Sequence, residues 1–196
     1  MTRHDSPPGA LALAPLTMPA LHRPPAWVRP LQVTGIFLGW LAVVVLATLV
    51  HPFPPARPYA LFAHLVFLAM SFGAVLAVEL QGLGLLVRLS SVERLVHVAA
   101  GLDPLIWLGL AGMAASGVIL GPHLDRPLTI VKLMAVLVVA INGLWARDLV
   151  RALRDLPTDI RRLPGSLVRR AARVSLVSQA GWWTAVIIGF LTSNSA

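Results

Sequence analysis

Five long apolar segments constrain the fold of this chain more than any other feature. Of its 196 residues, 57% are hydrophobic and only 12% are charged, which is more apolar surface than a water-soluble domain of this size can bury. At about 1.5 Å per residue, each segment can cross a hydrocarbon core of about 30 Å as a helix. The sequence therefore predicts an all-α, polytopic membrane bundle of five transmembrane helices, 31–192. The expected spans are approximately residues 31–50, 59–86, 95–120, 128–146 and 174–192.

Two less apolar regions flank these spans. Residues 1–30 contain seven prolines, which disfavour regular helix. We expect a disordered or interfacial tail there and no cleavable signal peptide, because the first apolar segment begins far from the N-terminus. Residues 147–173 are expected to form an Arg-rich loop that contains a short helix and breaks at Pro157 and Pro164.

The arginines predict the orientation of the bundle. Five spans place successive loops on alternate sides, and one side then carries only Arg57, Arg126 and a lysine within a span. By the positive-inside rule the N-terminus is cytoplasmic and the C-terminus faces outward, as expected for a multi-pass protein of the bacterial cytoplasmic membrane. The arginines on the N-terminal side are Arg3, Arg23, Arg29, Arg88, Arg94 and the eight from Arg147 to Arg173.

Charge and cysteine content narrow the partners and cofactors. The net charge is +8, but the arginines follow the loops and lack the interleaved aromatic residues of single-strand binders, so we expect no nucleic acid. The absence of cysteine excludes disulfides, thiolate nucleophiles and iron–sulfur clusters. The expected partners of loop 147–173 are anionic lipid headgroups or, alternatively, other subunits of a complex.

Lys132 is the only lysine and lies early in the fourth apolar segment. A cation near the membrane centre costs about 2.5–3.5 kcal/mol on insertion scales, so such residues usually have a function or a specific partner. Helix geometry places Lys132 and His64 both roughly 8 Å below the outer boundary. His51, at a span end, and His123, in a loop, lie near the same level. The sequence predicts a His/Lys site there, with His51 and His123 as additional candidates.

Two carboxylates form a second polar layer nearer the cytoplasm. Glu79 and Asp103 each lie nine residues from an arginine at the inner boundary, so both are roughly 13 Å deep. Buried carboxylates at one depth share a proton, meet a cation or line a wet cavity. This layer is the candidate ion or proton site of a transporter.

Several chemistries suit the outer layer. A neutral imidazole is a ligand for haem iron or copper, and His64 projects from a helix as such a ligand must. Lys132 would neutralise a haem propionate, ligate as a free amine or bind an anionic substrate. A haem with two histidine ligands would have to recruit His51 or His123, because His97 lies near the opposite side. The alternative is structural: a hydrogen-bonded histidine and a lysine that snorkels to lipid phosphates.

A short pattern also runs through segments 63–80, 107–122 and 127–149. A histidine near the start of one span is followed by a small-residue helix ending in a Ser-Gly step and by a span opening with an aliphatic-Lys-Leu step. These positions are His64, Ser116-Gly117 and Val131-Lys132-Leu133. The pattern resembles a broad group of small bacterial membrane proteins that includes the copper-resistance D type proteins and the small membrane protoporphyrinogen oxidases.

The resemblance implies haem b, with His64 as axial ligand of the iron and Lys132 as its partner. Where the oxidases have a Tyr-His pair near the end of the lysine-bearing span, this chain has Asn142-Gly143. Haem binding is therefore expected without the oxidase activity.

Three functions follow as hypotheses. The first is a haem-binding or redox-related membrane protein with its site at His64 and Lys132. The second is an accessory or structural subunit of a larger membrane complex, because the chain forms no complete active site by itself. The third is a proton-coupled or metal-ion transporter that uses Glu79 and Asp103.

Overall fold

Five long helices make up most of the part of the chain that the structure describes, as the sequence predicts. A computed structural model describes residues 25, 27–50, 54–156 and 163–193, and within this part of the chain there is no strand. Each of the five helices is long and apolar enough to cross a membrane, which makes the chain a multi-pass membrane protein. The helices are α1 (Val28–Leu49), α2 (Arg57–Leu86), α3 (Val92–Leu120), α4 (Pro127–Arg154) and α5 (Gly165–Ser193), with a short 3₁₀ turn at Pro54–Ala56 before α2.

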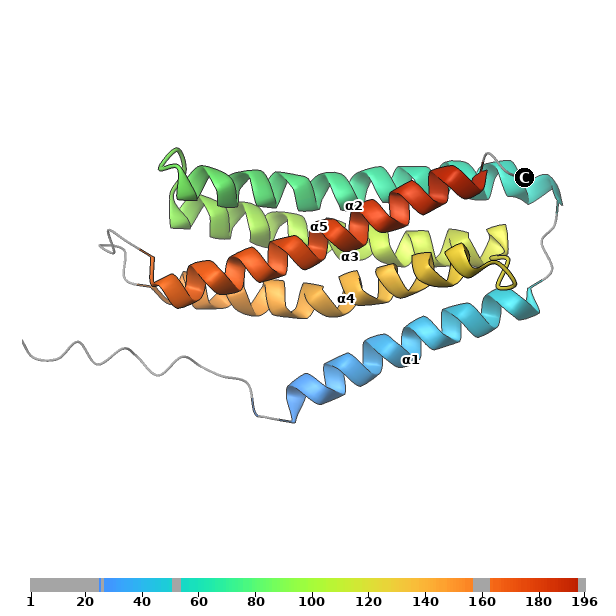
Figure 1. Cartoon of the computed structure of the whole chain (residues 1–196), viewed down its shortest axis with the longest axis horizontal. Coiled ribbons are helices and arrows are strands. Elements are labelled where there is room, and N and C mark those ends of the chain that lie inside the picture. The colour runs from blue at the N-terminus through green and yellow to red at the C-terminus, as the bar shows by residue number, and fades with distance from the viewer. Residues whose placement is uncertain (1–24, 26, 51–53, 157–162, 194–196) are drawn as a thin grey trace, which may run out of the picture.

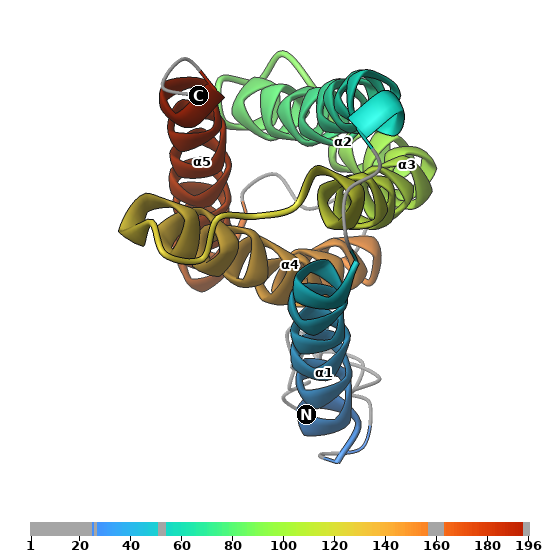
Figure 2. The same cartoon turned by 90° about the vertical axis from the view of Figure 1, so that its right-hand side faces the viewer.

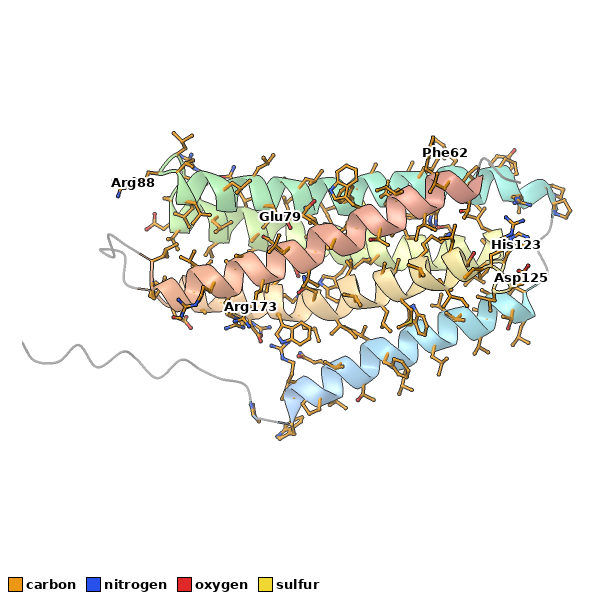
Figure 3. The ribbon with its side chains drawn as sticks, in the orientation of Figure 1. Phe62, Glu79, Arg88, His123, Asp125 and Arg173 are labelled. Carbon is orange, nitrogen blue, oxygen red and sulfur yellow. The ribbon has the colours of Figure 1, made fainter. Side chains whose placement is uncertain are left out.

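Helices α2 to α5 form the bundle, and α1 lies outside it. Helix α2 packs along α3, and α4 packs along α5. Viewed from the end in Figure 2, the four helices surround a common axis while α1 contacts only the α3 and α4 side. Two ends can be distinguished. We call the one with Arg88, Arg151 and Arg170 the arginine end, and the one with His64 and His123 the histidine end. Figure 3 labels Arg88 at the first end and His123 at the second.

Local sequence explains most helix boundaries. The Ser91 hydroxyl accepts a hydrogen bond from the Arg94 amide at 3.2 Å and so caps the start of α3. Gly121 ends α3 with a φ of 69°, which glycine adopts without strain. Pro127 opens α4, where the missing amide hydrogen would have had no helical partner. Pro30 is tolerated in the first turn of α1 for the same reason.

Two expected boundaries differ from the observed helices. Helix α4 continues to Arg154 and α5 begins at Gly165, so much of 147–173 is helical. The arginines there are compatible with helix, and a helix extends beyond the apolar core without penalty once its side chains reach water or headgroups. The expected break at Pro157 lies outside the described residues, as does most of the tail, 1–24 and 26.

The α2–α3 contact is close because its side chains are small. Ser71 is completely buried, and its hydroxyl donates a hydrogen bond to the Ile106 carbonyl of α3 at 2.8 Å. A Cβ added at Gly109 would lie only 2.5 Å from the Ser71 Cβ and 2.8 Å from the Phe67 carbonyl oxygen. Backbones approach this closely only where one helix carries glycine. The seam sets the spacing between His64 on α2 and its neighbours on α3.

An aromatic cluster fills the middle of the bundle. Trp182 of α5 is 2% exposed and packs with Met113 and Val139. The Phe72 ring of α2 stacks on Trp182, with centroids 5.4 Å apart. Helix α1 is attached differently, through a hydrogen bond of 3.0 Å from the Trp40 indole nitrogen to the Leu133 carbonyl of α4.

Candidate functional site

His64 is held by a hydrogen bond that determines which ring nitrogen is available. Its Nδ1 lies 3.0 Å from the Ser116 Oγ of α3. The Ser116 hydroxyl has a single proton and donates it within its own helix, to the Gly112 carbonyl at 2.7 Å. The roles in the His64–Ser116 bond depend on the tautomer of the ring, and with the Ser116 proton donated to Gly112 the tautomer that fits is the one with the hydrogen on Nδ1. This leaves the Nε2 lone pair free to bind a metal or accept a proton.

The surroundings of His64 also orient its ring. Ser116 is 5% exposed, so the hydrogen bond is shielded from competing water. A Cβ added at Gly117 would lie 3.8 Å from the imidazole Cε1, in ordinary contact, so the ring rests against the α3 backbone at this glycine. The Ser-Gly step that the sequence singled out thus supplies both the acceptor and the space for His64.

Lys132 lies near the start of α4, at the same end of the bundle as His64. It is two helical turns before the core residue Val139 and so shares the bundle-facing side of α4. Lys132 is half-buried and makes no hydrogen bond or ion pair with any residue that the structure describes. An imidazole nitrogen and an uncompensated cation therefore share the histidine end.

The additional histidines do not join this pair in the described part of the chain. His51 lies outside the described residues. His123 is exposed in the turn between α3 and α4, and Figure 3 shows it beside Asp125 at the tip of the bundle. Its carbonyl accepts a hydrogen bond from the Arg126 amide at 3.2 Å, which is ordinary turn structure. Within the described ranges, no group of three or more His, Asp or Glu side chains is arranged to hold a metal ion.

A shallow apolar groove runs beside the His64–Ser116 hydrogen bond, between α2 and α3. Its volume is about 330 Å³. Small side chains line most of it because the α2–α3 seam is built from them. The lining residues are Ala56, Tyr59, Ala60, Ala63, Phe67, Gly112, Ala115, Ser116 and Ile119.

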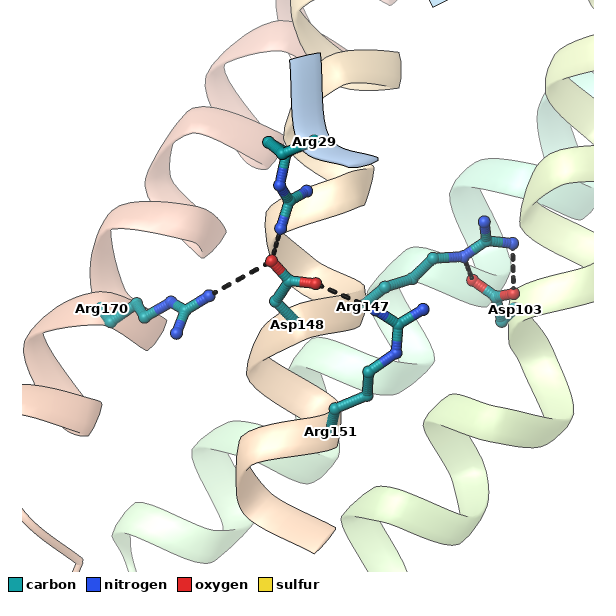
Figure 4. A network of polar contacts seen from close by, with 6 residues as sticks. All are labelled: Arg29, Asp103, Arg147, Asp148, Arg151 and Arg170. Atoms are coloured by element: carbon teal, nitrogen blue, oxygen red, sulfur yellow. Dashed lines mark hydrogen bonds and ion pairs between the residues drawn. The ribbon is translucent and has the colours of Figure 1, made fainter. Parts of the chain in front are cut away.

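The two carboxylates of the inner layer bind different partners. Asp103 of α3 receives two hydrogen bonds from Arg147 of α4, from Nε to Oδ1 at 2.8 Å and from Nη2 to Oδ2 at 2.6 Å (Figure 4). The Trp107 indole nitrogen donates to the same Oδ1 at 3.2 Å, and the Arg147 guanidinium carbon lies 4.6 Å from the Trp107 ring centroid. Asp103 is thus neutralised by an arginine.

Glu79 belongs to another set of hydrogen bonds. Its carboxylate accepts from the side-chain amide of Gln179 on α5. The Gln179 oxygen in turn accepts from the Trp183 indole nitrogen at 2.9 Å. Figure 3 shows Glu79 in the middle of the bundle, on the α2 side facing α5. The equal depths of Glu79 and Asp103 therefore do not make them neighbours with a common ligand.

Sequence reasoning missed Arg147 as the partner of Asp103. It counted Arg147 as the first residue of a loop, one position after the expected end of the fourth span. A carboxylate inside a membrane needs a cation, but the expected span end placed Arg147 at the inner boundary, roughly 13 Å from the level of Asp103, so the pair could not be found by depth alone. Gln179 carried no comparable signal, since a neutral amide is tolerated in many positions of a membrane helix.

The chain was compared with protein-family models, with curated proteins and with solved structures, and none of them matches it.

Proposed function

We propose that this membrane protein binds haem b at its histidine end and serves in electron transfer or haem handling. In this proposal His64 ligates the iron through Nε2, and Lys132 pairs with a propionate. The observation that carries it is the 3.0 Å hydrogen bond between His64 Nδ1 and Ser116, which holds the ring and, in the tautomer with the hydrogen on Nδ1, leaves the Nε2 lone pair for a metal.

The donor set fits such a group in three respects. Haem needs an imidazole whose second nitrogen is engaged elsewhere, and His64 has this arrangement. Its propionates need a cation, and Lys132 has no carboxylate partner in the described residues. Its edge needs apolar surroundings, and the α2–α3 groove, which Ser116 lines but His64 and Lys132 do not, offers an apolar surface next to the site. When bound, haem would supply one-electron chemistry, while the chain would hold it, orient it and exclude water.

The proposal extends the resemblance noted in the sequence. His64, Ser116-Gly117 and Val131-Lys132-Leu133 are the positions shared with the copper-resistance D type proteins and the small protoporphyrinogen oxidases. The hydrogen bond between His64 and Ser116, and the position of Lys132 at the same end of the bundle, support the proposal. A bacterial cytoplasmic membrane, with the arginine end on the cytoplasmic side, is the proposed location, supported by the distribution of arginines.

An absorption spectrum tests the proposal. The full chain is purified in detergent from haem-replete cells, and spectra are recorded before and after reduction with dithionite. We expect a Soret band that shifts on reduction. The variant His64→Ala should lose it. A matched control is His97→Ala, which removes an exposed histidine of α3 at the arginine end and should keep the wild-type spectrum.

A second measurement separates ligation from folding. Protein from haem-deficient cells is titrated with haemin, and Lys132→Gln should bind it more weakly with an unchanged band position, because the cation is lost and the ligand kept. A colourless wild-type preparation that also fails to bind added haemin would contradict the proposal. Equal spectra for His64→Ala and His97→Ala would contradict the assignment of His64. Either result would favour the accessory-subunit or transport hypothesis.

A further inference from the structure

Three arginines from three helices converge on one aspartate at the arginine end. Asp148 of α4 pairs with Arg29 of α1, with Arg151 of α4 at 3.1 Å and with Arg170 of α5 at 3.8 Å (Figure 4). We call these four residues the Arg29 cluster. It lies on a different face of α4 from the Arg147–Asp103 pair, because Arg147 and Asp148 are consecutive and leave the helix about 100° apart.

The cluster has too little negative charge. Three guanidinium groups and one carboxylate leave two positive charges uncompensated. The charges of Arg170 and Arg151 both act on Arg29. In addition, the Nη1 of Arg29 is buried and has no hydrogen-bond partner among the described residues. A buried donor of a charged group without an acceptor is costly, so this arrangement calls for an anion.

The geometry favours a phosphate group as that anion. The flat guanidinium of arginine matches two oxygens of a phosphate, and several arginines around one phosphate form a strong site. The position favours a lipid. Arg29 is in the first turn of a helix that can span the membrane, and two residues before it Trp27 is 65% exposed, as an indole at the membrane interface would be. A phospholipid phosphate lies at this same interfacial level.

We propose that the Arg29 cluster binds the phosphate of an anionic phospholipid headgroup, and that this lipid joins α1 to α4 and α5. The unpartnered Nη1 of Arg29 donates to the phosphate, with Arg170 and Arg151 completing the site. Asp148 competes with the phosphate for the same guanidinium groups while it holds them in place. This inference does not depend on the haem proposal, since the two sites lie at opposite ends of the bundle.

Binding of phosphatidylglycerol, measured by native mass spectrometry of the full chain in mild detergent, tests this inference. We expect retained phosphatidylglycerol in preference to phosphatidylcholine. Arg29→Gln and Arg170→Gln should each weaken phosphatidylglycerol binding about fivefold, the effect of about one interfacial charge. The matched control is Arg173→Gln, which removes the same charge from an exposed position one turn along α5. It should change binding much less.

The variant Asp148→Asn gives a prediction of opposite sign. With the competing carboxylate removed, phosphatidylglycerol should bind more tightly, by about fivefold on the same scale. Thermal unfolding of each variant in detergent shows whether it is folded. The variant Arg29→Lys keeps the positive charge but loses the bidentate contact of the guanidinium with the phosphate. It should bind with intermediate affinity.

Two results would overturn the assignment. The first is equal phosphatidylglycerol binding by Arg29→Gln and Arg173→Gln together with unchanged binding by folded Asp148→Asn, which would leave the cluster as a purely structural ion pair. The second is complete displacement of the lipid by millimolar inorganic phosphate, which would show that the site takes a soluble phosphate and no lipid headgroup. Retention of the lipid in inorganic phosphate supports the proposal.

Discussion

The α2–α3 seam yields a sharp prediction, because it depends on one glycine. We expect Gly109→Ala to destabilise the protein by separating these two helices. The new Cβ would lie 2.5 Å from the Ser71 Cβ and 2.8 Å from the Phe67 carbonyl oxygen. Carbon atoms in contact prefer about 3.5–4.0 Å, so the helices would have to move apart by about 1 Å. The neighbours are a backbone oxygen and a short side chain, neither of which can rotate away.

The magnitude follows from three contributions. Overpacking of this kind costs about 1–3 kcal/mol. Moving the helices apart also weakens the 2.8 Å hydrogen bond from the fully buried Ser71 hydroxyl, which costs about 1 kcal/mol more. Alanine is favoured over glycine inside a helix by about 1 kcal/mol, which opposes both. The free energy of unfolding of Gly109→Ala should therefore fall by about 1–3 kcal/mol.

Unfolding by sodium dodecyl sulfate in mixed micelles, followed by tryptophan fluorescence, measures this change. The control is Gly73→Ala on α2, where an added Cβ would meet nothing within 4 Å. That variant should be unchanged or more stable by up to about 1 kcal/mol, from helix propensity alone. If Gly109→Ala were as stable as Gly73→Ala, the close approach of α2 and α3 would be refuted.

Three more predictions concern polar contacts between helices. In a double-mutant cycle of Asp103→Asn and Arg147→Gln, the coupling energy should be about 1–2 kcal/mol. This is less than for a buried pair, because both side chains are about one-third exposed. Asp125→Asn, in an exposed turn, is the neutral control, and a coupling energy of zero would refute the pair. Trp40→Phe should lower stability by about 1 kcal/mol in the same assay, because the hydrogen bond to α4 is lost while the ring is kept, and an unchanged midpoint would contradict it. Asn142→Leu should lower the free energy of unfolding by about 1–3 kcal/mol, because the Asn142 side chain is 5% exposed and its amide donates a hydrogen bond to the Val174 carbonyl of α5 at 2.9 Å. An unchanged free energy of unfolding would show that this contact does not hold α4 to α5.

The end of the bundle at which a polar residue lies was predictable from the sequence, whereas partners were not. Counting residues placed His64 and Lys132 at one level, and both lie toward the histidine end of the bundle. The same counting placed Glu79 and Asp103 at one level, yet they bond to Gln179 and Arg147 respectively. The difference is rotational, because a depth says nothing about the direction in which a side chain leaves its helix.

The sequence by itself determined the fold class, the number of spans and the end of the bundle toward which each polar residue lies. These properties depend on the length and polarity of single segments, and a helix in a membrane must satisfy its own backbone. Only the tertiary structure decided that Ser116 engages His64 Nδ1, that Arg147 neutralises Asp103 and that three arginines surround Asp148. Those contacts join distant segments, and they depend on how closely small residues such as Gly109 let neighbouring helices approach.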